Sequence, residues 1–393
     1  MDIRRGAALL AAAAIVVGAC SGAAGSPKPS VQASLGASEG ELNLVAWASY
    51  VVGGTGGEKV EGVDWVTPFE QASGCKVTVK VGGSSDEMLT LMKTGQYDGV
   101  SASGDATLRL IAGGDVAAVN FDLIPNYKDV FVGLKNQLYN SVNGVGYGVP
   151  HGRGANLLAW RTDIVTPAPD SWGVVFDGNS PYKGKVTAYD VPIYMADAAV
   201  YLKSAKPDLK ITNPYELDDA QFKAVVDLLK TQRGLIGEYW TDGTKQIQSF
   251  TTGTTVIGTT WQYQVNTMAL SKPPAPVKAI KPKEGSTGWS DTWMISSKAK
   301  HPNCMYKWMD YIISPKGNAD VTVYYGEAPV SAKACAEAEK QSAGHCVAFH
   351  AEDEAYFKDV YYWSTPVKDC GDSRGSVCKD YSEWTKAWVE IKG

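Results

Sequence analysis

The stretch Thr287 to Ser296, TGWSDTWMIS, combines residue types that seldom occur together in one strand. Its alternation predicts a single β-strand with Trp289, Asp291 and Trp293 on one face. Aspartate is depleted in strands and is costly to bury without a partner, so this face is either hydrated or meets a cation. A carboxylate neutralises an ammonium group, and indole rings attract it by about 2 kcal/mol when desolvated. The stretch therefore predicts a site for a small organic cation.

Sequence motifs give little support to catalysis or nucleotide binding. The glycine-rich VVGGTGGEKV at 51–60 resembles a phosphate loop, but Glu58 stands where a glycine must precede the lysine, and Val60 stands where Ser or Thr must bind magnesium. The zinc motif HExxH is absent, and no placed nucleophile or carboxylate pair can be matched to a geometry. A secreted hydrolase is therefore the less favoured alternative to a binding protein, and we expect no cofactor.

The N-terminus, MDIRRGAALLAAAAIVVGAC, has a basic start, an apolar run and small residues before Cys20, which is the anatomy of a secretion signal. Its last four residues resemble a lipobox, which implies cleavage before Cys20 and lipidation of the thiol. Residues 1–19 are predicted to be a lipoprotein signal peptide, with an ordinary secretion signal as the alternative. Residues 20–40 are rich in Gly, Ala, Ser and Pro and are expected to form a disordered tether. We therefore expect the protein to be anchored by lipid at the extracellular face of the cell membrane, which is the periplasm if an outer membrane is present.

Six cysteines remain after Cys20, an even number that favours disulfides outside the cytoplasm. Six cysteines allow fifteen connectivities, and no CxxC or Cys/His spacing supports a metal site instead. Short loops favour two of the pairs and leave the third by remainder: Cys335 with Cys346, Cys370 with Cys378, and Cys75 with Cys304.

Composition indicates a large globular protein. The 393 residues include 44% hydrophobic and 20% charged residues, and this length favours two domains over one. The net charge is −5, which argues against nucleic acid as a partner and mildly favours cationic ones.

Hydrophobic patterns alternate between strand and helix periods after Glu41. The segments are a strand at 42–46, a helix around 63–73, a strand at 76–83, a helix at 84–95, a strand at 97–103 and a helix at 103–114. A repeated β-α order predicts a parallel sheet covered by helices, with ligands beyond the carboxyl ends of its strands. Four polar or aromatic residues lie just past such ends: Trp47, Ser49, Ser103 and Asp105.

A second α/β region follows the glycine-rich segment at 143–154. It contains strands at 184–190 and 254–261 and helices at 195–204 and 218–234, and a pattern like that of the first region returns after 281. We therefore predict two α/β lobes with a hinged cleft between them. Their predicted composition is 41–149 plus 287–328 for lobe 1 and 150–286 plus 329–393 for lobe 2.

Several segments together resemble the extracellular solute-binding proteins of bacterial ABC importers, in particular the spermidine/putrescine-binding group. The segments are AWASY (46–50), YDGVSAS (97–103), LIPNYKDV (123–130), YGVPHGRGANLLAWRTD (147–163), SW with YKGKV (171–186), PKEG with GWSD (282–291) and HPNCMYKWMDYIISPKG (301–317). The resemblance implies a type II periplasmic-binding-protein fold that closes over a small cationic solute. It also implies membrane permease subunits as partners, and we expect a monomer.

The resemblance carries the family's amine site onto particular positions. Trp289 and Asp291 match a W-x-D after KEG, and Trp47, Ser103 and Trp261 match family residues at strand ends. Asp190 and Tyr194 fall near a position that supplies carboxylates, although the surrounding segment departs from the family pattern. Asp105 and Glu327 stand where the family tends to have aromatic residues. With Ser49, these residues form the predicted ligand set.

Simpler explanations exist for three of the acidic residues. Asp105 follows Ser103-Gly104 at the start of a helical run, where it would act as a helix cap. Asp190 precedes Pro192 by two residues, which suits a turn, and Glu327 would suit a surface loop.

Two alternative solutes follow from other residues. His151 and Arg153 occupy the predicted crossing segment, and a guanidinium facing the cleft would favour a zwitterionic, amino-acid-like solute. Tyr324-Tyr325 resembles the paired tyrosines with which related proteins hold ferric iron, although no acidic or histidine partner is identifiable by spacing.

Overall fold

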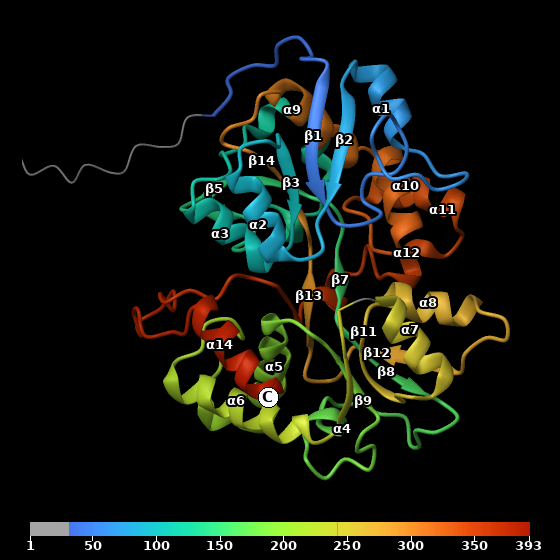
Figure 1. Ribbon diagram of the computed structural model, residues 1–393, viewed down its shortest axis with the longest axis vertical. Helices are drawn as coiled ribbons and strands as arrows, with labels where there is room; N and C mark the ends of the chain where they lie inside the picture. Colours follow the sequence, from blue (N-terminus) through green and yellow to red (C-terminus); the bar gives the residue numbers. More distant parts are fainter. Residues whose placement is uncertain (1–30, 242) are drawn as a thin grey trace, which may run out of the picture. The chain divides into compact units, whose positions relative to one another are not determined.

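The computed structural model describes residues 31–241 and 243–393, which contain two α/β lobes (Figure 1). The predicted signal peptide and Cys20 lie outside the described residues. Within those residues, no helix is both long and apolar enough to cross a bilayer.

Lobe 1 is built around a five-stranded mixed sheet in the order β2-β1-β3-β14-β6. β1 pairs in parallel with β2 and β3, whereas β14 runs antiparallel to β3 and β6. Alternating residues of KVTVKV produce β2, as its period of two predicts. The strands are β1 (Glu41–Ala46), β2 (Lys76–Val81), β3 (Gly99–Ala102), β6 (Gly148–Pro150) and β14 (Thr292–Ile295).

The helices of lobe 1 begin where the sequence supplies capping groups. Ser84 accepts a hydrogen bond from the Glu87 amide at the start of α2, and Ser314 and Ser331 cap α10 and α11 in the same way. The helices are α1 (Val66–Ser73), α2 (Ser85–Lys93), α3 (Gly104–Ala112), α9 (Pro302–Ile312), α10 (Pro315–Tyr325), α11 (Ala332–Gln341) and α12 (His345–Ala348). Short 3₁₀ turns (Phe121–Leu123, Pro125–Asp129, Val132–Leu134) lead to the hairpin β4 (Ser141–Val142) and β5 (Val145–Gly146).

Lobe 2 has its own five-stranded sheet in the order β10-β9-β11-β8-β12. Its strands are β8 (Leu157–Arg161), β9 (Val186–Tyr189), β10 (Ile236–Trp240), β11 (Ile257–Thr260) and β12 (Val277–Ile280). Its helices are α4 (Gly173–Phe176), α5 (Met195–Ala205), α6 (Asp219–Arg233), α7 (Gly243–Thr252), α8 (Gln262–Leu270) and α14 (Tyr381–Lys392), with 3₁₀ turns at Pro192–Tyr194 and Pro207–Leu209. A full capping box between Asp218 and Gln221 begins α6.

Three crossing segments join the lobes in a small sheet of order β15-β13-β7. Figure 1 shows β7 and β13 running between the two large sheets. The strands are β7 (Gly154–Ala155), β13 (Ser286–Trp289) and β15 (Val360–Tyr362), and the short helix α13 (Glu354–Phe357) precedes the last of them. The predicted two-lobed α/β fold is therefore confirmed.

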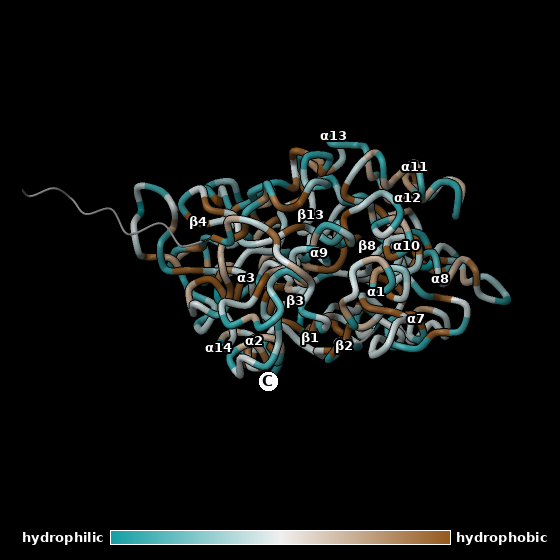
Figure 2. Tube along the Cα trace, turned by 90° about the horizontal axis from the view of Figure 1, so that it is seen from above, coloured by the Kyte–Doolittle hydropathy of each residue, from teal (hydrophilic) through white to brown (hydrophobic). Residues whose placement is uncertain are grey.

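Each lobe has a separate hydrophobic core. The largest cluster fills lobe 2 around Trp172, Trp240 and Trp384, and a second surrounds Trp65, Trp293 and Trp308 in lobe 1. Figure 2 shows the hydrophobic segments in the interior and hydrophilic residues along most outer loops.

Two sequence-based boundaries differ from the structure. Residues 329–351 were assigned to lobe 2, but Val330 belongs to the core of lobe 1, and Cys335, Ala338 and Phe349 pack against Ala319 of α10. The chain returns to lobe 2 only after α12, because the helical hairpin of α10 and α11 buries its small residues within lobe 1. The pattern of small apolar residues in this segment does not indicate which of the two lobes it packs against.

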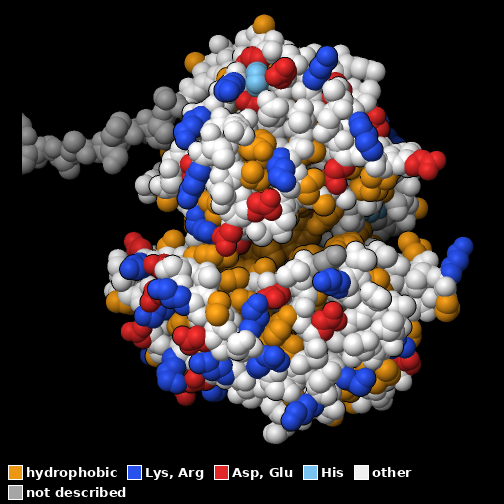
Figure 3. Space-filling model, in the orientation of Figure 1, with side chains coloured by type: hydrophobic (Ala, Val, Ile, Leu, Met, Phe, Trp, Pro, Cys, Tyr) orange, Lys and Arg blue, Asp and Glu red, His pale blue; other side chains and the backbone are white. Residues whose placement is uncertain are grey.

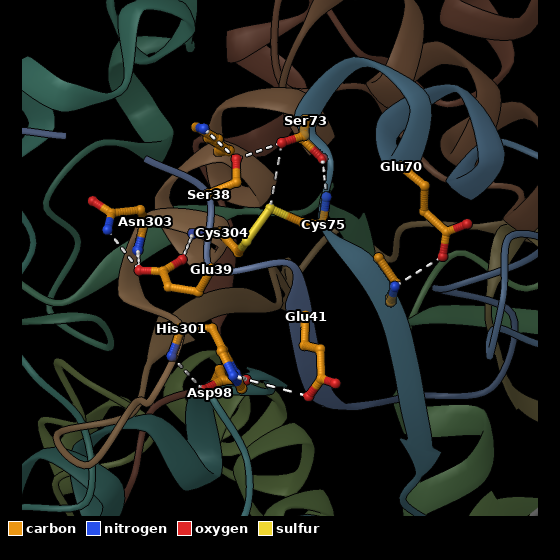
Figure 4. The surroundings of a disulfide bond; sticks show 12 residues. Ser38, Glu39, Glu41, Glu70, Ser73, Cys75, Asp98, His301, Asn303 and Cys304 are labelled. Carbon is orange, nitrogen blue, oxygen red and sulfur yellow. Dashed lines mark hydrogen bonds and ion pairs between the residues drawn. A yellow bond between two sulfur atoms is a disulfide. The ribbon is translucent and has the colours of Figure 1, made fainter. Parts of the chain in front are cut away.

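The end of the predicted tether was expected to be disordered, but residues 31–40 lie along lobe 1 near the start of α9. Glu39 accepts hydrogen bonds from the amides of Asn303 and Cys304, both at 2.9 Å, and Gly36 N–H donates to Asn303 Oδ1 at 2.7 Å. These bonds lower the pKa of Glu39 although burial opposes them. Figure 4 shows Glu39 in this position beside the disulfide. An acidic side chain at a helix N-terminus holds this segment, which composition alone did not indicate.

The predicted disulfide connectivity is confirmed. Cys75–Cys304 joins the start of β2 to α9, Cys335–Cys346 joins α11 to α12, and Cys370–Cys378 closes a loop before α14. The first pair links residues 229 apart in sequence and therefore fastens the beginning of lobe 1 to its late-returning segment (Figure 4).

Candidate functional site

The Asp291 carboxylate lies between the ends of several lobe 1 strands. Tyr50 Oη donates to its Oδ2 at 2.7 Å, and Ser103 Oγ donates to its Oδ1 at 2.6 Å. The side chain is only 4% exposed, and within residues 31–241 and 243–393 it forms no ion pair with Lys or Arg. Its two oxygens are thus held by neutral hydroxyl groups, and its negative charge has no protein countercharge.

The surrounding elements explain this convergence. Tyr50 follows the end of β1, Ser103 follows the end of β3, and Asp291 lies in the break between β13 and β14. Ser49 adopts a positive φ of 71° and its N–H donates to Glu58, which turns the chain after β1 so that Tyr50 enters the interior. Ser103 occupies the N-cap position of α3, but its hydroxyl makes no cap hydrogen bond and serves Asp291 instead.

The prediction of one continuous strand through Asp291 was wrong. β13 ends at Trp289 and crosses between the lobes, and β14 begins at Thr292 in the lobe 1 sheet. Trp293 consequently faces the lobe 1 core, where it is fully buried, and does not share a face with Trp289. The break at Ser290-Asp291 lets one short stretch serve two sheets, and alternation alone could not reveal it.

Aromatic rings from both lobes surround this carboxylate. Tyr325 packs edge-on against Tyr50 at 4.9 Å and against Trp289 at 6.1 Å, measured between ring centroids. Tyr263 at the start of α8 lies 5.8 Å from Tyr325 and 6.1 Å from Trp261, so rings of lobe 2 meet rings of lobe 1. Figure 3 shows a groove between the lobes with hydrophobic side chains along it.

A second carboxylate, Glu327, is buried beside His151. His151 Nε2 lies 3.3 Å from Glu327 Oε1, and neither carboxylate oxygen of Glu327 has a hydrogen-bond partner among the described residues. The indole of Trp293 donates to His151 Nδ1 at 2.8 Å, so this nitrogen is the acceptor. His151 also stacks on the ring of Tyr50, with 3.8 Å between the ring centroids. The pair of His151 and Glu327 therefore lies on the far side of the Tyr50 ring, whose hydroxyl donates to Asp291.

Burial controls the charges of this cluster. It raises the pKa of Asp291 to about 6, while the Ser103 and Tyr50 hydroxyls act in the opposite direction. Burial also raises the pKa of Glu327 well above its usual range, and the neighbouring Asp291 adds to that increase. Burial lowers the pKa of His151 to about 3. Near neutral pH the cluster therefore contains an ionised Asp291 and a neutral imidazole, and burial favours the protonated form of Glu327.

Two predicted ligand residues have partners elsewhere. Asp190 accepts hydrogen bonds from Lys392 at 2.6 Å and Trp388 at 2.9 Å, so α14 already neutralises it. Tyr194 is fully buried in the lobe 2 core, where Gln232 donates to its hydroxyl at 2.7 Å. The structure does not bring these two residues to Asp291.

Asp105 lies in the first turn of α3 and connects elements of both lobes. Ser85 of α2 donates to its Oδ1 at 2.9 Å, Tyr381 of α14 donates to its Oδ2 at 3.4 Å, and Thr365 donates to its backbone oxygen at 2.9 Å. Because Ser103 is the N-cap residue, Asp105 is not the cap that the sequence suggested. Its contacts are those of an interlobe support.

Arg153 does not face the cleft as a free cation. Its guanidinium donates to Glu354 at 2.8 Å and to the Ala351 carbonyl at 2.7 Å, and it stacks on Phe357 at 3.8 Å. The side chain is 1% exposed. Arg153 therefore holds the crossing segment in place, and its charge is paired with Glu354 and is not available to an anionic group of a solute.

Sequence reasoning missed Tyr50, Tyr263 and Tyr325 as members of the site. Tyr50 ends the AWASY segment and follows the strand end by four residues, so its position was a usable signal. Tyr325 was considered only as part of an iron-binding pair, but its neighbour Tyr324 packs near Trp65 at 5.5 Å and points to a different environment.

One hydrolase motif occurs in the sequence, because Gly371 to Gly375 reads GDSRG and matches GxSxG. That motif requires a strand-to-helix turn that exposes the serine above a sheet. Here it lies in the loop closed by Cys370–Cys378, and Arg374 pairs with Asp372 at 2.9 Å. The segment is a disulfide-closed loop and lacks the geometry of a nucleophile elbow.

The fold and the enclosed site define a solute-binding protein. The sequence profile of the family described as bacterial extracellular solute-binding protein matches residues 64–348. The chain therefore belongs to the bacterial extracellular solute-binding proteins, as the resemblance of its segments predicted, and this family serves transport and not catalysis.

Two proteins of known binding class and one solved structure are similar to this chain over most of its length. The chain is 23% identical over 309 residues to a putrescine/cadaverine-binding protein of Pseudomonas aeruginosa, covering 75% of this chain and 80% of that protein. It is 25% identical over 289 residues to spermidine/putrescine-binding periplasmic protein 1 of Haemophilus influenzae, covering 72% and 73%. The structure of a spermidine/putrescine ABC transporter substrate-binding protein of Streptococcus pneumoniae superimposes with a TM-score of 0.67 at 16% identity, over 89% of this chain and 97% of that one.

Proposed function

We propose that this protein captures a small cationic solute, a polyamine such as putrescine or spermidine, between its lobes and delivers it to the permease of an ABC importer. The observation that carries this proposal is the Asp291 carboxylate, which is buried among aromatic rings and has no Lys or Arg partner among the described residues. The names of the sequence relatives support the same solute class.

The physical chemistry of an alkyl diamine suits this arrangement. Its ammonium group needs a carboxylate in a site that excludes water, and its methylene chain gains about 0.8 kcal/mol per buried CH₂ against aromatic walls. Trp289 and Tyr325 supply walls from the side of Asp291, and Trp261 and Tyr263 supply them from lobe 2. A solute that touches both lobes stabilises their closed arrangement by its higher affinity for that arrangement.

The first experiment measures solute binding by the purified mature chain. Putrescine, cadaverine, spermidine, a set of amino acids, ferric iron and sugars are compared by thermal shift and isothermal titration calorimetry. A polyamine with micromolar affinity stabilises the folded state by about 4 kcal/mol at millimolar concentration. Binding of a polyamine with no response to sugars supports the proposal, whereas a response confined to another class rejects it.

A zwitterionic solute is the second candidate, for a reason different from Arg153. The indole N–H of Trp289, which packs against Tyr325 at this site, is buried without a hydrogen-bond partner among the described residues. Buried donors of this kind suit a solute that brings an acceptor as well as an ammonium group. An amino-acid-like solute that binds more tightly than putrescine in the same panel would favour this candidate.

Ferric iron receives less support. Tyr324 and Tyr325 have different neighbours, and the described residues contain no group of three or more His, Cys, Asp and Glu side chains that could hold a metal ion.

We also propose that Cys20 anchors the protein to the extracellular face of the membrane and that it works as a monomer beside its permease. The proposal on Cys20 follows from its sequence context. Expression of the full chain and of Cys20→Ser in a bacterial host tests it. Mass spectrometry is expected to find a diacylated N-terminal cysteine and membrane-bound protein for the former only. Soluble, unacylated wild-type protein would contradict the proposal.

A further inference from the structure

A continuous chain of hydrogen bonds runs from Trp261 to the buried carboxylate of Asp197. The Trp261 indole donates to Asn156 Oδ1 at 2.7 Å, and Asn156 Nδ2 contacts Thr287 Oγ1 at 2.6 Å and Tyr189 Oη at 3.3 Å. Thr287 Oγ1 donates to Asp197 Oδ1 at 2.9 Å, and Tyr189 Oη donates to Oδ2. Asn156, Thr287, Asp197 and Tyr189 are each at most 2% exposed.

The chemistry of these groups gives every bond one direction. An indole N–H can only donate, so the Asn156 atom that faces Trp261 must be the amide oxygen. The amide nitrogen then faces the two hydroxyls and donates to them, which leaves each hydroxyl to donate its own proton onward. In its ionised form the Asp197 carboxylate accepts both protons and donates none. Ionised Asp197 is therefore the acceptor at which the whole chain of hydrogen bonds terminates.

The residues of this hydrogen-bond chain lie on elements from different parts of the fold. Asp197 is on α5 and Tyr189 ends β9, both in lobe 2, whereas Thr287 is on the crossing strand β13. Asn156 lies between β7 and β8, and its backbone N–H also donates to the Thr287 carbonyl at 2.9 Å. Because β13 continues to Trp289 and then Asp291, the chain connects the Trp261 ring to the strand that leads into the carboxylate site.

We propose that Asp197, acting through Thr287, Tyr189 and Asn156, is a positioning residue that holds the Trp261 indole in the orientation in which it contacts the solute. This inference rests on the proposed function in one respect, because it takes Trp261 to be a wall of the solute site. Trp261 also packs edge-on against Trp240 at 5.0 Å, so packing and the hydrogen-bond chain act on the same ring.

A carboxylate suits this role better than a neutral side chain. Asparagine at this position would present its NH₂ group to one of the two hydroxyls, and that hydroxyl would then lose the acceptor of its own proton. Burying a carboxylate without a cation is unfavourable, and Asp197 has no Lys or Arg partner among the described residues. A role in orienting the chain gives a reason for a buried acid that core packing does not.

The first test observes the Trp261 indole directly, without solute. The mature protein is labelled with ¹⁵N at the indole nitrogens, and the Trp261 signal is assigned by its loss in Trp261→Phe. Asp197→Asn is expected to shift this signal, because the hydrogen bond to Asn156 weakens. Trp172 donates to the Gly285 carbonyl at 2.9 Å in the same lobe and is the internal control, whose signal is expected to stay in place.

The second test is a double-mutant cycle on solute affinity, using the polyamine that binds wild type most tightly. Asp197→Asn is expected to weaken binding about five- to tenfold in the wild-type background. In the Trp261→Phe background, which keeps an aromatic wall but lacks the indole N–H, the same substitution is expected to change affinity less than about twofold. Thr287→Val removes one hydroxyl from the hydrogen-bond chain with little change of side-chain shape. If Asp197→Asn does not fold, Thr287→Val takes its place in both tests.

The results separate this inference from the proposed function. If no solute of the panel binds wild type, the proposed function fails, and the indole signal alone decides whether Asp197 controls Trp261. A Trp261 signal that does not move, or a Trp172 signal that moves equally, overturns the inference. Additive effects of the two substitutions on affinity overturn it as well, even if a polyamine binds tightly.

Discussion

Two buried aspartates in this protein have nearly the same immediate surroundings. Asp291 accepts hydrogen bonds from Tyr50 and Ser103, and Asp197 accepts them from Tyr189 and Thr287, so each carboxylate holds one phenol and one aliphatic hydroxyl. Burial raises the pKa of Asp291 to about 6 and that of Asp197 to about 7. The two aspartates differ in the residues that surround these hydrogen-bond donors.

Asp291 is bonded to Tyr50, whose ring packs against Tyr325, and Tyr325 in turn lies 5.8 Å from Tyr263 of lobe 2. Asp197 is instead enclosed in lobe 2 by Tyr189 and Thr287, which both accept from Asn156. The same carboxylate chemistry therefore meets a solute at one place and orients a side chain at the other. Hydrogen-bond partners alone do not reveal which role an acid has, because the role depends on whether a foreign cation can reach it. The predictions below test this distinction.

Removing the charge of Asp291 is expected to have the largest effect. In Asp291→Asn the solute ammonium would be buried without a countercharge, and affinity should fall about 1,000-fold. Isothermal titration calorimetry measures this loss, and circular dichroism checks that the fold is retained. Asp197→Asn is the matched control, with a loss of about tenfold at most. Equal losses in the two variants would remove the distinction between the two acids.

A disulfide that closes a longer loop is expected to stabilise the fold more, although the effect grows only with the logarithm of loop length. Replacing Cys75 and Cys304 by Ser should lower the free energy of unfolding by about 2–5 kcal/mol, since this pair closes a long loop in the lobe that holds Asp291. Cys370 and Cys378 enclose a short loop in lobe 2, and replacing them should cost less, about 2 kcal/mol. Urea unfolding followed by fluorescence compares the two variants. A larger loss for the short loop would contradict the expected order.

Solute affinity is expected to depend on pH through Asp291. A cation binds the ionised carboxylate, so affinity should be constant above pH 7 and fall about tenfold per unit below the pKa of about 6. Calorimetry at pH 5, 6, 7 and 8 measures this profile. Asp291→Asn should show no such step, and a step of the same size in that variant would assign it to another group.

The same ionisation has the opposite effect on the solute-free protein. Because burial raises the pKa of Asp291 above that of the unfolded chain, its contribution to stability is present below about pH 4 and is lost as pH rises through about 6. A polyamine is expected to restore that contribution above pH 6. Thermal unfolding with and without putrescine over this pH range checks the sign.

Removing single hydroxyls is expected to have the smallest effect. Tyr50→Phe deletes a donor to Asp291, which raises the pKa of this carboxyl and moves the midpoint of the affinity profile upward by about one pH unit. Tyr189→Phe deletes the equivalent donor to Asp197 and should leave that midpoint unchanged. Calorimetric pH profiles of both variants make the comparison. If Tyr189→Phe moves the midpoint as far as Tyr50→Phe does, the two acids are not independent.

Much of the fold could be predicted from sequence, because local signals there agree with each other. The helix at 218–234 has a complete capping box at Asp218 and a continuous apolar face, and the structure forms α6 at that place. The assignment of residues 329–351 failed because the small apolar residues of α11 would suit the surface of either lobe. Local propensity defines a helix, but only packing decides which core receives it.

The candidate site was predictable where residues follow strand ends. Trp47 and Ser103 were predicted in this way, because strand ends of one sheet meet at a common edge, and the Ser103 hydroxyl donates to Asp291. Asp291 itself was predicted from the residue types of its own segment. Asp190 also follows a strand, but its carboxylate already accepts hydrogen bonds from Lys392 and Trp388. These two residues lie about two hundred positions later in the sequence. A pattern within a short window carries no information about such distant partners.

By itself, the sequence determined the β-α order of each lobe and the presence of an acid between tryptophans along the chain, because these depend on composition and short spacing. It favoured the disulfide pairs that the structure forms, because two of them close short loops. Only the tertiary structure decided that Arg153 is neutralised by Glu354, that Trp293 belongs to the core, and that Asp291 has no cationic partner among the described residues. The physical reason is that a buried charge is governed by whatever surrounds it within a few ångströms, and those neighbours come from several separate crossings of the chain.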